Sequence, residues 1–102
     1  MARITMTLAE LKASLSASAP PPQLPRTLAA LWHDAKGDWD AAHKVAQDID
    51  GADGAWIHAY LHRKEGDAGN AAYWYRRAGK PVSTRSLADE WEEIAMELMR
   101  RE

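Results

Sequence analysis

The chain of 102 residues contains no cysteine, and this absence excludes disulfides, thiolate zinc sites and cysteine nucleophiles. Serine and threonine are missing between Thr27 and Ser83, which argues against a Ser–His–Asp site in the middle of the chain. No glycine-rich loop precedes a Lys-Ser or Lys-Thr pair, so a phosphate-binding loop is not expected. No apolar run approaches the length of a membrane span. The function must therefore be sought in other residue types, chiefly histidine, arginine and the aromatic residues.

A strong net charge is also missing, because the formal charge is only −2 and gives no overall attraction to nucleic acid. The charge is nevertheless unevenly distributed. Residues 34–53 hold two lysines against six aspartates, and residues 86–102 hold two arginines against six acidic residues. Residues 60–85, between these blocks, hold six basic residues against two acidic ones. This basic band could steer an acidic partner toward the chain, or it could pair with the acidic blocks beside it.

The N-terminal segment shares one feature with secretion signals, since Arg3 and some apolar residues precede the small residues 16–19. However, Glu10 and Lys12 interrupt what would be the apolar core of a signal peptide. Thr7 and Glu10 instead fit a capping box that opens a short helix over residues 8–16. We therefore expect a cytoplasmic protein. The four prolines of residues 18–25 predict an extended linker, which divides a short helix and linker (1–24) from one helical domain (25–102).

The most informative pattern is a repeat with a spacing of 29 residues. Residues 36–38 (Lys-Gly-Asp) recur as residues 65–67 (Glu-Gly-Asp), and His33 corresponds to His62. The apolar positions that recur are Leu28 with Ile57, Leu31 with Tyr60, Trp32 with Leu61, Ala42 with Ala71, Val45 with Trp74, Ala46 with Tyr75 and Ile49 with Ala78. A repeat of this length is typical of stacked helical hairpins, so the fold class is predicted to be all-α.

The helix signals place five further helices at residues 26–36, 39–49, 54–65, 68–78 and 87–101. Gly37 and Gly66 are predicted to end the first helix of each hairpin, and the aspartate after each glycine to cap the second. Asp53 is predicted to cap the helix that begins at residue 54. The periodicity leaves Trp56 off the main apolar faces. It also places the glutamates of the last helix mostly outside, namely Glu90, Glu92, Glu93 and Glu97.

Residues 37–42 (Gly-Asp-Trp-Asp-Ala-Ala) resemble the turn and second-helix start of a tetratricopeptide (TPR) repeat. Residues 71–78 (Ala-Ala-Tyr-Trp-Tyr-Arg-Arg-Ala) also resemble the Sel1-like variant, and the resemblance covers about residues 26–81. The stretch from Leu31 to Pro81 is also similar to small bacterial proteins of unknown function. The resemblance implies two stacked TPR-like hairpins between an N-terminal short helix and a C-terminal capping helix. It implies a scaffold that binds peptides or proteins, with no catalytic residues and no cofactor. A homodimer would be another way to cover an open end of the stack.

The predicted docking surface is a mixture of aromatic and basic side chains, of the types that anchor protein interfaces and clamp carboxylates. Two other interpretations stay open for these side chains. The same mixture could stack on single-stranded nucleic acid, or Arg76 and Arg77 could pair with Glu90, Glu93 or Glu97 of the last helix. The residues expected to bind a protein or peptide partner are Tyr60, Arg63, Lys64, Tyr73, Arg76 and Arg77.

An alternative function is the binding of a divalent metal, either as a metal-binding domain or as a metalloenzyme. His58 and His62 are four residues apart on one predicted helix, and Glu65 follows on the same strip. Three side chains from adjacent helical turns can converge on one ion, and His33 or His43 could add a fourth ligand. The structural interpretation is that His62 fills a packing position that the repeat normally gives to an aromatic residue.

Overall fold

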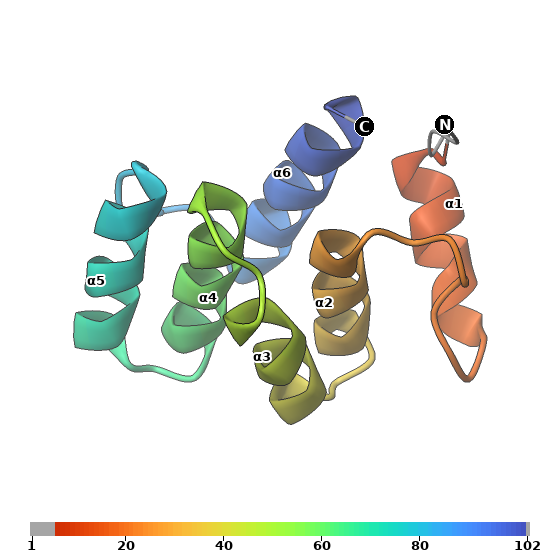
Figure 1. Ribbon diagram of the computed structural model, residues 1–102, viewed down its shortest axis with the longest axis horizontal. Coiled ribbons are helices and arrows are strands. Elements are labelled where there is room, and N and C mark those ends of the chain that lie inside the picture. Colours follow the sequence, from red (N-terminus) through yellow and green to blue (C-terminus); the bar gives the residue numbers. More distant parts are fainter. Residues whose placement is uncertain (1–5, 102) are drawn as a thin grey trace.

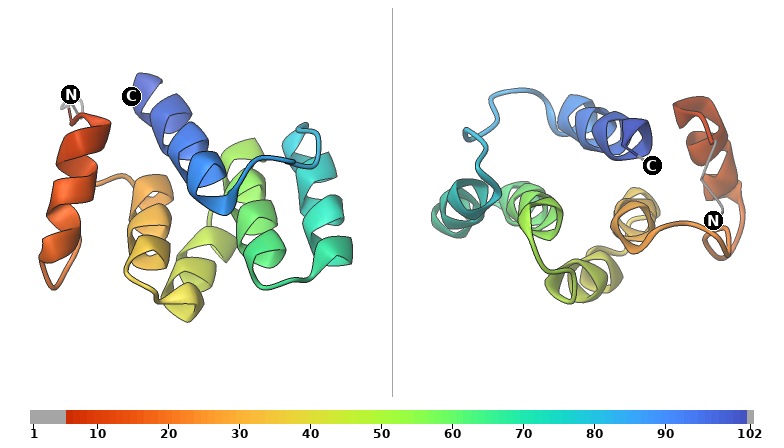
Figure 2. Two further views of the ribbon diagram at one scale, coloured as in Figure 1. Left: turned by 180° about the vertical axis from the view of Figure 1, so that it is seen from behind. Right: turned by 45° about the horizontal axis from the view of Figure 1, so that its top comes forward.

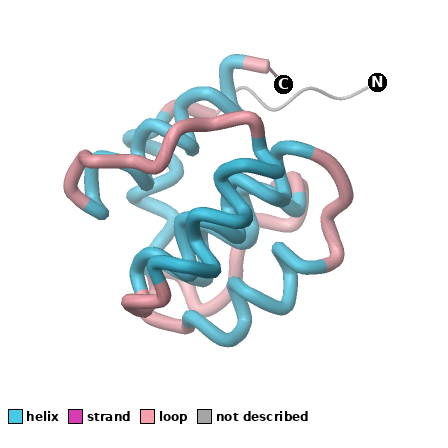
Figure 3. Tube along the Cα trace, turned by 90° about the vertical axis from the view of Figure 1, so that its left-hand side faces the viewer, coloured by secondary structure: helices cyan, strands magenta, loops and turns pink. Residues whose placement is uncertain are grey.

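The computed structural model describes residues 6–101, and these contain six α-helices and one short 3₁₀ helix (Figure 1). The α-helices are α1 (Leu8–Ala13), α2 (Arg26–Ala35), α3 (Trp39–Gln47), α4 (Ala52–Lys64), α5 (Ala68–Ala78) and α6 (Leu87–Arg100). The 3₁₀ helix, Ser14–Ser16, continues α1 directly. Figure 3 shows only helices and loops in the described residues, so the all-α prediction is confirmed. Arg3, part of the signal-like pattern, lies outside the described residues.

Most helix starts are fixed by the side chains that the sequence indicates. Thr7 and Glu10 form the predicted capping box, with the Thr7 amide donating to Glu10 at 2.8 Å and the Glu10 amide donating to Thr7 at 3.1 Å. Asp38 and Asp67 accept the amides of the residues three positions on, at 3.0 and 3.2 Å. The glycines before them have φ values of +85° and +89°, a backbone conformation that residues with a Cβ atom rarely adopt.

The start of α4 differs from the prediction. The helix begins at Ala52 rather than at residue 54, and its N-cap is Gly51, which has a φ of +92° and makes no side-chain cap bond. Asp53 is not the cap, because it lies in the first turn and its carboxylate pairs with Arg101 at 2.8 Å. A partner 48 residues away in the sequence therefore takes the carboxylate that local rules assign to the helix start.

The repeat in the sequence is also a repeat in packing. Helices α2 and α3 form one hairpin and α4 and α5 form the second, and the tight turns inside them are alike. In the first turn the backbone amide of Asp38 donates to the carbonyl oxygen of His33 at 3.0 Å. In the second turn the backbone amide of Asp67 donates to the carbonyl oxygen of His62 at 2.9 Å. In six of the seven recurring apolar pairs both members have the same degree of burial. The spacing of 29 residues therefore corresponds to a real structural unit.

Helices α2 and α4 form the centre of the molecule, with α3 on one side and α6 on the other (Figure 2). Helix α5 packs on α4 at one end, and α1 packs beside α6 at the other. The helix α6 is fixed to α2 by the indole of Trp91, which donates to the Leu31 carbonyl at 2.9 Å. The fully buried large side chains of the core are Leu11, Leu28, Leu31, Trp32, Ile57, Leu61, Tyr75 and Ile94. Among the described residues, no helix has the length and apolar character needed to cross a membrane.

Candidate functional site

Two carboxylates lie inside the molecule, and each is held by one tyrosine and one basic side chain. Asp34 is 2% exposed and accepts hydrogen bonds from the Tyr60 hydroxyl and the Lys64 ammonium, both at 2.9 Å. Glu90 is 1% exposed and accepts from the Tyr75 hydroxyl and from Arg63 at 2.8 Å. Glu90 was predicted to lie outside, and this prediction is wrong because the internal network holds its carboxylate.

These networks divide the predicted docking residues into two groups. Tyr60 is 2% exposed, so it offers almost no surface to a partner. Arg63 and Lys64 lie at the edge of the core, with their charges directed at Glu90 and Asp34. Burial raises the pKa of Tyr60 above its ordinary value, and the neighbouring Asp34 carboxylate raises it further. These three residues therefore stabilise the fold and do not share a free surface with the other three.

The other three lie on the outer side of α5. Tyr73 is 44% exposed, and Arg76 and Arg77 are exposed one turn further along the helix. The Arg77 guanidinium lies 5.8 Å from the centre of the Tyr73 ring and 5.6 Å from that of Trp74. We call Tyr73, Arg76 and Arg77 the basic face.

The acidic residues of α6 do not neutralise the basic face. Glu90 pairs with Arg63, Glu93 pairs with Arg85 at 3.4 Å, and Glu97 pairs with Arg100 and Arg101. Within residues 6–101, five of the seven arginines form an ion pair, and Arg76 and Arg77 are the two that do not. The interpretation in which both arginines pair with α6 is therefore not observed.

A second site is a cluster of three histidines between the two hairpins. His43 comes from α3, and His58 and His62 come from successive turns of α4. One ring nitrogen from each of the three lies within 4.8 Å of the others, and the Nε2 atoms of His43 and His58 are 2.9 Å apart. The rings of His58 and His62 are stacked at 4.9 Å, and the His43 ring stands nearly perpendicular to both. We call these three residues the histidine cluster.

The structure changes the predicted ligand set of His58, His62 and Glu65. The Glu65 carboxylate lies 2.7 Å from the Nδ1 atom of His62, where it orients that ring instead of facing His58. His43 takes the third place in the cluster, and His33 packs edge-on against Trp32. Glu65 and Asp67 also form, together with His62, a second group of side chains that could hold a metal ion.

Two tryptophans pack against the cluster. The Trp39 ring stacks on His43 at 4.8 Å, and its indole nitrogen donates to the Leu61 carbonyl at 2.8 Å. The Trp74 ring stacks on His58 at 4.0 Å. Burial lowers the pKa of His58 to about 4, with a further contribution from His43 and His62, and burial also lowers the pKa of His43. Both histidines are therefore uncharged at neutral pH, which is the form that binds metals.

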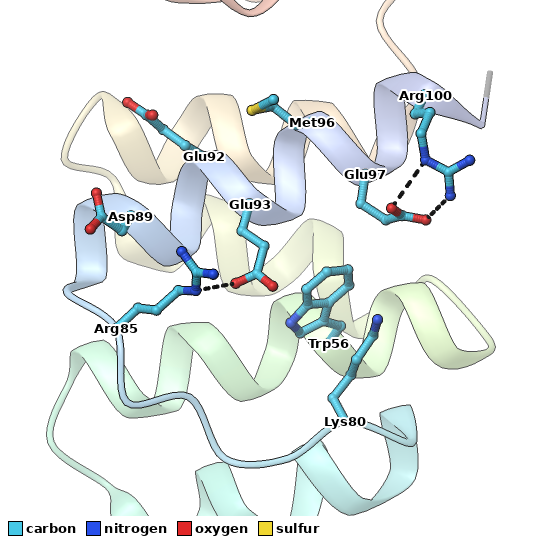
Figure 4. Close-up of a pocket in the computed structure, with 9 residues that line it drawn as sticks. All are labelled: Trp56, Lys80, Arg85, Asp89, Glu92, Glu93, Met96, Glu97 and Arg100. Carbon is cyan, nitrogen blue, oxygen red and sulfur yellow. Dashed lines mark hydrogen bonds and ion pairs between the residues drawn. The ribbon is translucent and has the colours of Figure 1, made fainter.

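A cavity of about 610 Å³ forms a groove between α6 and the loop that follows α5 (Figure 4). Trp56 forms its floor, and the Lys80 ammonium lies 4.1 Å from the centre of that indole ring. Trp56 is only 5% exposed, so the expectation that it lies off the apolar faces is corrected by the packing of α6 over α4. On the wall of the groove, Glu93 is paired with Arg85 and Glu97 with Arg100.

No family model, no curated protein and no solved structure matches this chain. The residues themselves therefore have to carry any functional argument. The sequence did not indicate the buried carboxylates, and it indicated His43 only as an optional fourth ligand rather than as one of the three. Both features depend on contacts between residues far apart in the sequence, which the repeat alignment does not indicate.

Proposed function

We propose that this chain is a small interaction module that binds an acidic segment of a protein partner through the basic face of α5. The observation that carries this proposal is which arginines are paired with carboxylates and which are not. In the described part of the chain, every arginine outside the basic face is paired with a carboxylate, whereas Arg76 and Arg77 are exposed and have no such partner. Two adjacent guanidinium groups without a carboxylate form a surface that a partner's carboxylates can complete.

The aromatic neighbours strengthen this surface. Tyrosine and arginine are enriched among the residues that contribute most to protein interfaces. Because Arg77 lies over the rings of Tyr73 and Trp74, its side chain is partly ordered before a partner arrives. A side chain that is already ordered loses less conformational entropy on binding. The basic face is therefore suited to a short acidic segment in which an apolar residue packs on Tyr73.

The fold supports the same role. We propose that the α2–α3 and α4–α5 hairpins are TPR-like units, because their turns and burial repeat as described above. Helices α1 and α6 would then serve as the caps that a short stack requires. The resemblance to TPR and Sel1-like repeats implies a scaffold for peptides or proteins, and the basic face lies on the second helix of the second unit.

A selection from a random-peptide display library tests this proposal without knowledge of the partner. The purified chain is immobilised, bound peptides are sequenced, and the selection is repeated with an Arg76→Ala/Arg77→Ala variant. We expect the wild type to enrich peptides rich in Asp and Glu, and the variant to lose that enrichment. The variant is expected to stay folded, because both arginines are exposed and neither forms an ion pair within residues 6–101.

The matched control is an Arg85→Ala/Arg100→Ala variant, which removes the same charge from the groove side of the molecule. This control should retain the acidic peptides. Equal loss in both double variants would mean that only the net charge matters, and it would contradict a localised site. Enrichment of peptides without an excess of acidic residues would contradict the proposed partner chemistry.

A further inference from the structure

The histidine cluster has the arrangement of a metal site built from three imidazoles. Its nitrogen atoms come within 4.8 Å of one another, and the closest pair is 2.9 Å apart. Tetrahedral zinc, with zinc–nitrogen bonds of about 2.0–2.1 Å, places its ligand nitrogens about 3.3 Å apart. The closest pair is slightly shorter than this value and the other separations are at most 4.8 Å, so the three nitrogens lie within the range that one shared ion requires.

The surroundings of the cluster are also those of a metal ligand set. Glu65 holds the Nδ1 atom of His62 at 2.7 Å, which leaves the Nε2 atom of the same ring free to bind an ion. A carboxylate on the second nitrogen of a ligating histidine fixes the ring orientation and raises its basicity. Stacking of Trp39 on His43 and of Trp74 on His58 restricts the other two rings. The three imidazoles are therefore held close to a binding arrangement before any ion is present.

The site can also be reached from solvent. A cavity of about 260 Å³ lies between the end of α3 and the start of α4, and His58 and Trp74 form part of its wall. His43 itself is only partly buried. His58 therefore borders open space, and His43 is partly exposed to solvent.

We propose that the histidine cluster binds one divalent zinc ion through His43, His58 and His62, with Glu65 as the carboxylate that orients His62. Imidazole nitrogens suit zinc, and three protein ligands leave a fourth position for water or another small ligand. The ion would join α3 of the first hairpin to α4 of the second. It would therefore stabilise the fold in addition to any role in binding a partner.

The first experiment is a calorimetric titration of the untagged, chelator-treated protein with zinc chloride at neutral pH. We expect one equivalent of zinc to bind with a dissociation constant in the micromolar range or below, and the unfolding temperature to rise with zinc concentration. The His43→Ala variant should lose this binding. The Glu65→Gln variant should bind about 10- to 100-fold more weakly, because its amide orients His62 less well.

Three further measurements keep the test decisive. A His33→Gln variant is the matched control, because His33 lies outside the cluster, and it should bind zinc as the wild type does. An Asp67→Asn variant should also bind normally, and its loss of binding would place the ion at His62, Glu65 and Asp67 instead. Circular dichroism of each variant separates loss of the site from loss of the fold. No zinc binding by the wild type, or undiminished binding by a folded His43→Ala variant, would overturn the proposal.

Discussion

The arginines of this protein differ in whether they pair with a buried carboxylate. Arg63 and Arg77 are both arginines of the basic band, but Arg63 faces a carboxylate that is 1% exposed, whereas Arg77 has no carboxylate partner in residues 6–101. A charge removed from water is costly unless it is paired and hydrogen-bonded. Arg63 therefore contributes to the stability of the fold, and Arg77 is one of the two arginines that we propose for binding.

The first prediction follows from this difference. Replacing Arg63 by methionine keeps most of its apolar stem but leaves Glu90 without its basic partner. The free energy of unfolding should fall by about 3 kcal/mol or more, since breaking a buried ion pair typically costs about 3–5 kcal/mol. Urea unfolding monitored by tryptophan fluorescence measures this loss. The matched change Arg85→Met, in an exposed pair with Glu93, should cost about 1 kcal/mol or less. Similar losses in the two variants would show that the Glu90 network does not stabilise the fold.

The second prediction concerns alkaline pH. Burial raises the pKa of Tyr75 above its ordinary value of 10.0, and its hydrogen bond to Glu90 raises it further. The folded chain therefore holds this proton more tightly than the unfolded chain. The resulting stability is complete below pH 10 and is lost as the pH rises above 10, by about 1.4 kcal/mol per pH unit for each such tyrosine. Burial and Asp34 raise the pKa of Tyr60 in the same direction.

The comparison with a Tyr75→Phe variant isolates this effect, because lysine and arginine titrate in both proteins. The variant should be less stable at pH 8, since the Glu90 carboxylate loses a donor, but its stability should fall less steeply above pH 10. Chemical unfolding at a series of pH values from 8 to 11.5 gives both slopes. Identical slopes would mean that Tyr75 ionises in the folded state as easily as in the unfolded chain.

At the scale of elements, the sequence predicted the helices well because the signals that start and end them are local. Glycine at a positive φ, aspartate at the cap and apolar residues at helical spacing lie within a few positions of one another. Where the prediction failed, the determining contact was distant in sequence. Asp53 pairs with Arg101 and Glu90 pairs with Arg63, and neither partner can be identified from the neighbouring residues.

The third prediction concerns the turn between α3 and α4. Gly54 is buried, and a Cβ atom at this position would lie 2.1 Å from the carbonyl oxygen of Ile49. This neighbour is backbone and cannot move aside easily. Gly54→Ala should therefore lower the free energy of unfolding by at least about 1–3 kcal/mol, the usual cost of overpacking.

Gly69 in α5 provides the control, because a Cβ atom there would have no neighbour within 4 Å. Gly69→Ala should be neutral or stabilise the protein by up to about 1 kcal/mol, since alanine favours helix more than glycine does. Thermal unfolding of both variants compares the two sites. A Gly54→Ala protein as stable as the wild type would contradict the close approach of α4 to the end of α3.

At the scale of the whole molecule, the repeat predicted two hairpins but not how the last helix covers them. Helix α6 packs against α1, α2 and α4, and the Trp91–Leu31 hydrogen bond joins residues 60 positions apart. The candidate sites show the same limit. Helical periodicity is enough to predict that Tyr73, Arg76 and Arg77 lie on the outer surface of α5. The contact between the His43 and His58 rings instead depends on how the two hairpins stack.

The division of charge is therefore a property of the folded molecule. Folding directs Arg63 and Lys64 inward to Glu90 and Asp34, pairs α6 with other arginines, and leaves Arg76 and Arg77 exposed beside Tyr73. We propose that a partner binds at this remaining basic face.

The fourth prediction concerns partner binding at the basic face, and site-specific photo-cross-linking in the cells that produce the protein measures it. A photoreactive phenylalanine analogue replaces Tyr73, which is 44% exposed on the basic face, or Met96, which is 55% exposed on α6. We expect the chain labelled at position 73 to cross-link to a distinct protein through an acidic segment, and the Arg76→Ala/Arg77→Ala substitutions to abolish that product. The chain labelled at position 96 should not form it. A product that forms equally from both positions, or one that persists without the two arginines, would contradict partner binding at the basic face.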